Sequence, residues 1–129
     1  MSIIAPKSES VFLGVDMEKF NPKVIKNTAD IFLTSTEKKN LESTGIESHI
    51  ALLIAFSAKE SLFKAIYPLT RSYFSFDAAR ILEIEGKSQT FTMELLLSLS
   101  NNFPVGSQYR GFYKIYNDCV ITLIYGSEI

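Results

Sequence analysis

A long amphipathic helix is the feature that most restricts how this chain can fold. Apolar residues recur at helical spacing through residues 50–66 and form a stripe along one side of the predicted helix. Thr44 and Glu47 have the spacing of a capping box and predict where this helix starts. Pro68 predicts its end at about Ile66, because proline cannot continue the hydrogen-bond ladder. The apolar stripe must be buried, so the rest of the chain has to supply a surface that covers it.

The other segments predict a shorter helix and several strands. Thr34 and Glu37 repeat the capping-box spacing and predict a polar helix that runs to about Glu42. Strands are predicted at residues 10–18, 79–85, 90–97, 109–116 and 120–125, and a further short helix at residues 21–30. One strand, then helices, then two antiparallel hairpins is the order of an α+β fold. We therefore predict a single α+β domain over residues 1–129, with the long helix packed on the sheet.

Composition and charge exclude several classes of protein. Thirteen basic and fourteen acidic side chains give a formal net charge of −1, so no overall field attracts nucleic acid, and an anionic substrate must be held by local charge. The longest apolar runs are far shorter than the roughly 20 residues that a membrane span needs. Cys119 is the single cysteine and cannot form an internal disulfide, and no secretory signal opens the chain. We expect a cytoplasmic protein with no membrane span and no nucleic-acid partner.

Two acidic residues stand at the end of the first predicted strand. Asp16 and Glu18 are two residues apart, so on a strand their side chains leave the same face and can reach one ion. Magnesium prefers hard oxygen ligands and binds carboxylates together with substrate phosphates. Gly14 lies on the same face and would leave room for a ligand or another strand. The alternative is a pair of solvated acids, since acid-x-acid is a common pattern.

A second group of charges lies on the mixed side of the long helix. Glu60 and Lys64 are four residues apart and are therefore neighbours on the helix surface, and Lys59 precedes Glu60. A simple surface ion pair would explain Glu60 and Lys64 without any function. Phe56 and Phe63 accompany these charges, which favours the edge of a partly desolvated cleft over a plain surface.

Together, the two groups resemble the two signatures of the 4′-phosphopantetheinyl transferase superfamily. The sequence GVDME at residues 14–18 resembles the signature of glycine, apolar residue, aspartate, apolar residue and glutamate. The sequence FSAKES at residues 56–61, followed by Lys64, resembles the signature of aromatic, small, any residue, Lys-Glu-Ser/Ala, two further residues and Lys. The resemblance runs over residues 13–124. Within the family, residues 55–68 look most similar to the enterobactin-synthase component type of siderophore-producing bacteria.

The resemblance implies a reaction, an ion and partners. The reaction is magnesium-dependent transfer of 4′-phosphopantetheine from coenzyme A to a serine of an apo acyl, peptidyl or aryl carrier protein, with release of adenosine 3′,5′-bisphosphate. By similarity, Asp16, Glu18 and Glu60 are implied to bind Mg²⁺. Glu60 is also implied as the general base, and Lys64 as a contact of the coenzyme A phosphates that assists the leaving group. Lys59 is implied to act on the phosphate side of coenzyme A or to have a structural role.

The chain departs from the two-half type of the family in length. Members of that type consist of two similar halves, and this chain resembles the C-terminal catalytic half alone. Half-length members, the holo-acyl-carrier-protein synthases, form trimers with coenzyme A between subunits. Three interpretations stay open. The chain is an active transferase assembled as a homo-oligomer, or a catalytically incomplete fragment, pseudoenzyme or binding module, or an unrelated α+β binding domain whose acids and lysines are only surface pairs.

Overall fold

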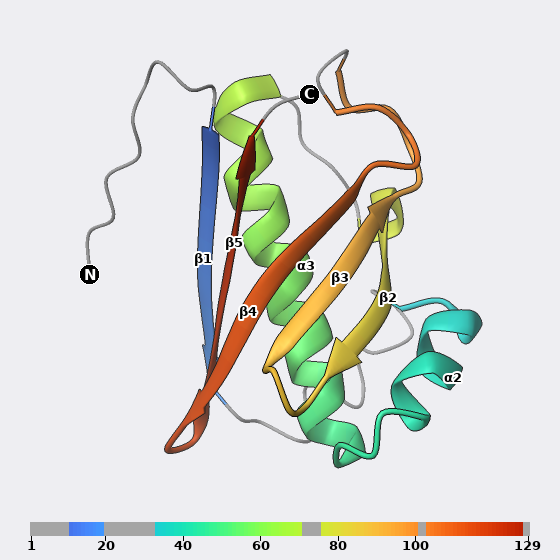
Figure 1. Ribbon diagram of the computed structural model, residues 1–129, viewed down its shortest axis with the longest axis vertical. Helices are drawn as coiled ribbons and strands as arrows, with labels where there is room; N and C mark the ends of the chain where they lie inside the picture. The colour runs from blue at the N-terminus through green and yellow to red at the C-terminus, as the bar shows by residue number, and fades with distance from the viewer. Residues whose placement is uncertain (1–10, 20–32, 71–75, 101–102, 128–129) are drawn as a thin grey trace.

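A five-stranded antiparallel sheet covered on one face by one long helix makes up the described part of this computed structural model, residues 11–19, 33–70, 76–100 and 103–127 (Figure 1). The elements are β1 (Val11–Lys19), α2 (Ser35–Glu42), α3 (Ser48–Thr70), a short 3-10 helix η2 (Phe76–Ala78), β2 (Ala79–Glu85), β3 (Thr90–Leu95), β4 (Gln108–Tyr116) and β5 (Cys119–Ser127). The strands lie in the order β1-β5-β4-β3-β2. This arrangement confirms the predicted α+β fold, including the two hairpins and the long helix packed on the sheet.

β1 and β5 are the first and last described strands along the chain, and they are neighbours in the sheet. β1 lies beside β5 (Figure 1), and their antiparallel register places Asp16 opposite Thr122. Side chains alternate between the two faces of a strand, so Gly14, Asp16 and Glu18 share the face that lies against α3. The pairing therefore brings the predicted acidic strand to the same face of the sheet as the long helix.

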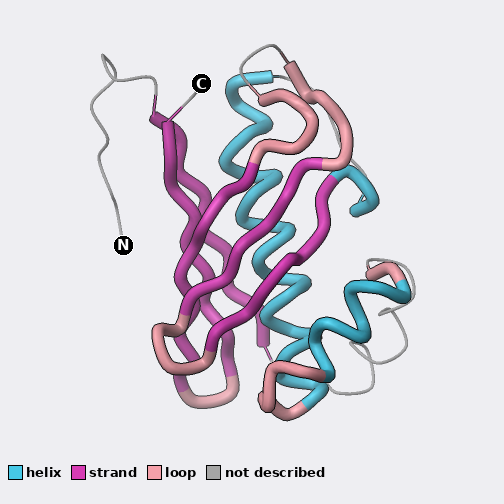
Figure 2. The backbone as a smooth tube through the Cα atoms, turned by 45° about the vertical axis from the view of Figure 1, so that its right-hand side comes forward, coloured by secondary structure: helices cyan, strands magenta, loops and turns pink. Residues whose placement is uncertain are grey.

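The hydrophobic core lies between α3 and the sheet (Figure 2). The side of α3 that was predicted to face the core is buried, and its fully covered residues include Ile54, Ala58, Leu62 and Ile66. The opposing sheet residues include Ile81, Phe91, Met93, Val120 and Ile124, which are also fully covered. Each buried side chain of this size stabilises the fold by roughly 1.5–3 kcal/mol. α2 packs beside this layer at the β2 edge of the sheet, and its Leu41 belongs to the core.

β1 comes closest to α3 at Gly14. A Cβ atom added there would lie 1.8 Å from the carbonyl oxygen of Ser61 and 2.8 Å from Cβ of Ala65. A side chain at this position would push the strand away from the helix, so glycine sets the distance between them. Sequence analysis predicted room for a ligand or another strand at Gly14, and the structure places a helix there.

One of the two predicted capping boxes is present. At the start of α2, the Thr34 hydroxyl accepts a hydrogen bond from the Glu37 backbone N–H at 3.2 Å, and the Glu37 carboxylate accepts one from the Thr34 N–H at 3.0 Å. The second predicted box is wrong, because Gly45 takes a φ of +77°, which no helix residue adopts. The Thr44 hydroxyl donates to the Leu41 carbonyl at 2.8 Å and so helps to close the turn before α3.

α3 is longer at its C-terminal end than predicted. It continues past Ile66 to Thr70, with Pro68 in its last turn. Proline cannot donate a backbone hydrogen bond and disturbs the helix around it. In the last turn this costs little, because few intrahelical hydrogen bonds remain after that point. Even at this length, neither α3 nor any other described helix is long and apolar enough to cross a membrane. The predicted helix at residues 21–30 lies outside the described residues.

Candidate functional site

Asp16 is the centre of a polar cluster between β1 and α3. Its side chain is buried, and burying a carboxylate is costly unless hydrogen bonds or charges compensate. Ser57 Oγ donates to one carboxylate oxygen, Oδ2, at 2.9 Å, and Lys64 Nζ donates to the other, Oδ1, at 2.5 Å. Both partners come from α3, so Asp16 links the two sequence motifs directly.

Glu18 and Glu60 complete the acidic group around Asp16. Burial raises the pKa of Glu18 to about 7, helped by a hydrogen bond to Asp16 and by the charges of Asp16 and Glu60. Burial and the charge of Asp16 also raise the pKa of Glu60. Lys64 opposes both shifts because its positive charge favours the ionised carboxylates. Because these charges shift the pKa values of Glu18 and Glu60, the predicted ligands Asp16, Glu18 and Glu60 lie close enough to interact electrostatically. Lys64 interacts with all three.

The chemistry of this group suits a hard divalent cation. Carboxylate oxygens are the ligands that Mg²⁺ prefers, and a cation would favour the ionised forms of Glu18 and Glu60, whose pKa values are raised by burial and by neighbouring negative charge. In the part of the chain that the structure describes, no three acidic, histidine or cysteine side chains already stand in an arrangement that could hold an ion. The positive charge that faces Asp16 is the ammonium group of Lys64. Binding of a metal would therefore require these side chains to rearrange.

Lys64 lies at the solvent side of the cluster. Its side chain is 55% exposed, whereas that of Asp16 is 2% exposed. The hydrogen bond to Asp16 raises the pKa of Lys64, and the charges of Asp16, Glu60 and Glu18 add to that effect. The lysine therefore stays protonated at neutral pH, and its exposed stem leaves the ammonium free to turn toward another anion.

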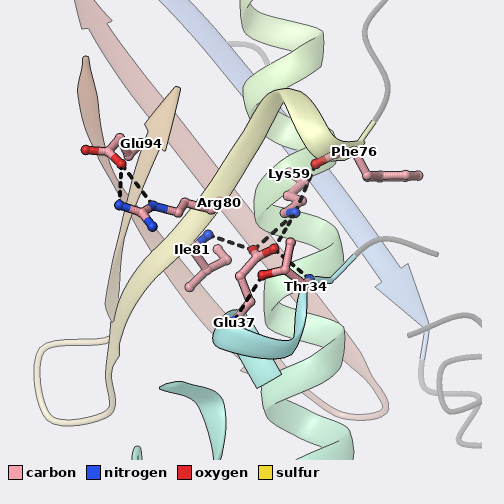
Figure 3. A network of polar contacts seen from close by, with 7 residues as sticks. All are labelled: Thr34, Glu37, Lys59, Phe76, Arg80, Ile81 and Glu94. Atoms are coloured by element: carbon pink, nitrogen blue, oxygen red, sulfur yellow. Dashed lines mark hydrogen bonds and ion pairs between the residues drawn. The ribbon is translucent and has the colours of Figure 1, made fainter. Parts of the chain in front are cut away.

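Lys59 points from α3 toward Glu37 of α2 and Phe76 of η2 (Figure 3). Its side chain is 1% exposed, and Nζ lies 3.1 Å and 3.2 Å from the two carboxylate oxygens of Glu37. It also donates to the Phe76 carbonyl at 3.0 Å. Burial lowers the pKa of Lys59, while the charge of Glu37 raises it. Of the two roles predicted for Lys59, the structural one matches this position.

Glu37 is a residue whose importance was missed, because sequence analysis treated it only as part of a helix cap. Its carboxylate accepts from Thr34 N–H, from Lys59, and from the backbone N–H of Ile81 at 2.8 Å. This single buried side chain thereby joins α2, α3 and β2 (Figure 3). The available signal was Lys59 itself, because a lysine among apolar helix residues needs a buried partner.

The aromatic residues predicted to border a cleft are covered by another part of the chain. Phe56 and Phe63 are partly buried, and their ring centroids lie 5.6 Å and 6.0 Å from that of Phe76. A cavity of about 590 Å³ lies elsewhere, between the turn that follows α2 and the β2–β3 hairpin. Its lining contains Glu83 and Glu85 but none of the clustered acids, so it belongs to a different region of the molecule.

Comparison with known proteins connects this arrangement to one family. The family profile described as the 4′-phosphopantetheinyl transferase superfamily matches residues 12–123. The chain belongs to this superfamily. Asp16, Glu18, Glu60 and Lys64 all lie within the matched region. The transferase superfamily identified from the two sequence motifs is thus confirmed.

The curated relatives are longer than the segments they share with this chain. The 4′-phosphopantetheinyl transferase Svp of Streptomyces mobaraensis is 35% identical over 96 residues, which are 73% of this chain and 38% of Svp. Enterobactin synthase component D of Escherichia coli (strain K12) is 39% identical over 54 residues, which are 41% of this chain and 26% of that protein. The chain therefore matches less than half the length of each.

A solved structure shows the same fold. The holo-[acyl-carrier-protein] synthase of Thermotoga maritima superimposes with a TM-score of 0.65, covering 92% of this chain and 65% of that one. Its sequence identity to this chain is 16%, so the likeness concerns the fold alone. The predicted transferase-like α+β architecture agrees with this comparison.

Proposed function

We propose that this chain transfers 4′-phosphopantetheine from coenzyme A to a serine of an apo carrier protein, with Mg²⁺ as the cofactor. The observation that carries the proposal is the contact between Asp16 of one signature and Lys64 of the other, with Glu18 and Glu60 beside them. The second product would be adenosine 3′,5′-bisphosphate. Acyl, peptidyl and aryl carrier proteins are the candidate partners, and similarity to enterobactin synthase component D favours siderophore biosynthesis.

In this proposal Asp16, Glu18 and Glu60 hold the magnesium ion. The bound ion would supply positive charge to the pyrophosphate of coenzyme A, the usual dominant contribution in such transfers. Asp16 is the ligand whose position is best determined, because hydrogen bonds fix its carboxylate from α3. Glu18 and Glu60 would approach from β1 and α3 once a cation offsets their repulsion.

Glu60 is the proposed general base. The serine oxygen of the carrier protein would attack the phosphorus that bears pantetheine, and the bond from that phosphorus to the bridging pyrophosphate oxygen would break. The serine proton would pass to the carboxylate of Glu60. Lys64, protonated and exposed, would neutralise charge on the departing phosphate.

A mass-shift assay tests the proposed reaction. Purified protein, coenzyme A, Mg²⁺ and an apo carrier protein should yield the carrier with one phosphopantetheine group added. Glu60→Ala should reduce the rate at least about a hundredfold, the scale on which removal of a general base acts. Glu42→Ala, at an exposed position on α2, is the matched control and should retain the rate. Failure of a correctly folded wild type with acyl, peptidyl and aryl carriers would contradict the proposal.

A second candidate function is that of a catalytically incomplete binding module. It is favoured by the exposed apolar side chains on the sheet face opposite α3. Met17, Phe112 and Tyr125 are 64%, 50% and 63% exposed on that face. Sedimentation analysis, together with assays of transfer and of coenzyme A binding, separates the two functions. A homo-oligomer with activity supports the transferase, whereas a monomer that binds coenzyme A without transfer supports the binding module.

A further inference from the structure

Two buried hydroxyl groups lie behind the carboxylate of Asp16. Ser57 Oγ is 2.9 Å from Asp16 Oδ2 and 2.8 Å from Thr122 Oγ1, and Thr122 Oγ1 also donates to the Ser57 carbonyl at 3.0 Å. Ser57 and Thr122 are both fully buried. An ionised carboxylate can only accept hydrogen bonds, so the Ser57 proton points to Asp16. The single proton of Thr122 is then shared between the carbonyl oxygen and the hydroxyl oxygen of Ser57.

The three residues come from three different elements. Asp16 is on β1, Thr122 is directly opposite it on β5, and Ser57 is on α3. The β1–β5 register and the packing of α3 on the sheet therefore fix the hydroxyls in place before any ligand arrives. A buried serine and threonine with satisfied hydrogen bonds form a rigid support.

This support distinguishes the two oxygens of Asp16. The terminal torsion of an aspartate side chain is otherwise broad, so an unsupported carboxylate could present either oxygen or an intermediate orientation. With Oδ2 held by Ser57, Oδ1 is the oxygen directed away from the hydroxyls. In this structure Oδ1 meets a cation, the ammonium group of Lys64.

We propose that Ser57 and Thr122 are positioning residues, which hold Asp16 so that Oδ1 is presented to a bound cation. The inference rests on the proposed function in one respect, namely that the physiological cation is a divalent metal. Neither hydroxyl would touch that metal or the reacting atoms. Partners of this kind typically change metal affinity about 10–100-fold when they are removed. A merely structural role predicts a different result, which is lower stability with unchanged cation affinity.

Equilibrium binding of Mn²⁺, a paramagnetic substitute for Mg²⁺, tests the inference without measuring turnover. Thr122→Val removes the hydroxyl at nearly constant volume and should weaken Mn²⁺ binding about tenfold, as should Ser57→Ala. Thr122→Ser keeps the hydroxyl and should restore wild-type affinity. Ser61→Ala is the matched control, because Ser61 is also buried on α3 but its hydroxyl donates to the Ala58 carbonyl and to no acid. Circular dichroism should first establish that each variant is folded at the temperature of the titration.

The outcomes separate the inference from the proposed function. Wild-type Mn²⁺ affinity in Ser57→Ala and Thr122→Val, with only a lower melting temperature, would overturn the positioning role and leave the metal site standing. Absence of Mn²⁺ binding by the folded wild type, with and without coenzyme A, would overturn both. If Ser57→Ala does not fold, the comparison of Thr122→Val with Thr122→Ser decides the question.

Discussion

The ammonium nitrogen of Lys64 lies 2.5 Å from Oδ1 of Asp16. This contact joins β1 to α3 at the point where the two signature motifs meet. Asp16 is buried and Lys64 is exposed, so the lysine reaches the carboxylate from the solvent side. A metal ion or a coenzyme A phosphate would have to arrive from that side as well. The metal ion would compete with Lys64 for Asp16, whereas the phosphate would compete with Asp16 for Lys64.

Replacement of Lys64 should therefore separate metal binding from catalysis. In Lys64→Met, Mn²⁺ should bind several-fold more tightly to the ligand-free protein, since no ammonium competes for Asp16 or repels the ion. Transfer should nevertheless fall about 10²–10³-fold, because charge on the departing phosphate is no longer neutralised. Lys114→Met, an exposed substitution on β4, should change neither quantity. Weaker Mn²⁺ binding in Lys64→Met would mean that the lysine helps to assemble the site.

The metal-free protein should lose stability as the pH rises toward neutrality. The pKa of Glu18 is raised from an ordinary 4.5 to about 7, so the folded state holds its proton over a range where the unfolded state has released it. Stability contributed by this group is therefore present below about pH 4.5 and declines up to about pH 7. In EDTA, the urea midpoint should fall over this range for wild type and fall less for Glu18→Gln. Equal slopes for the two proteins would contradict the raised pKa.

Removal of Glu37 should destabilise the fold strongly. Glu37→Ala would leave the ammonium of Lys59 buried without its carboxylate, and the Ile81 N–H without its acceptor. Loss of one partner of a buried ion pair costs about 3–5 kcal/mol, which urea denaturation can measure. The double variant Glu37→Leu with Lys59→Met should recover much of this loss because no charge remains buried. A loss below about 1 kcal/mol in Glu37→Ala would show that the pair is not buried in solution.

Gly14→Ala should separate β1 from α3. The new Cβ would lie 1.8 Å from the Ser61 carbonyl oxygen, so the strand or the helix must move, at a cost of roughly 1–3 kcal/mol. That movement would also carry Asp16 away from Glu60, the proposed metal ligand on α3, and so weaken Mn²⁺ binding. Gly86→Ala is the matched control, because the nearest atoms to its added Cβ are 3.9 Å away. Equal stability of both variants would contradict the close approach at Gly14.

Local sequence patterns predicted most of the helices and strands well. Alternation and turn residues identified the strands, and helical spacing identified the buried side of α3, because both signals come from neighbouring residues. Spacing alone placed Asp16 with Glu18 and Glu60 with Lys64. Only the recognised motifs brought the two pairs together, because their contact depends on how β1 packs against α3.

Features that depend on long-range packing were missed. Sequence patterns left Lys59 with either a phosphate-side or a structural role. Its partner Glu37 was not foreseen, because Glu37 comes from a helix whose position at the sheet edge no local pattern reveals. The pairing of Ser57 with Thr122 was missed for the same reason, since it joins residues 65 positions apart. The failed capping box at Thr44 has a local cause, namely the positive φ of Gly45.

The position of β1 at the edge of the sheet has a consequence for how the protein is made. Among the described strands, β1 pairs only with β5, the last one to leave the ribosome. Asp16 and Glu18 are thus translated about 100 residues before β5 but cannot occupy their final strand position until β5 has been made. A nascent chain halted before Cys119 would contain every acid of the cluster and still lack the strand that aligns two of them.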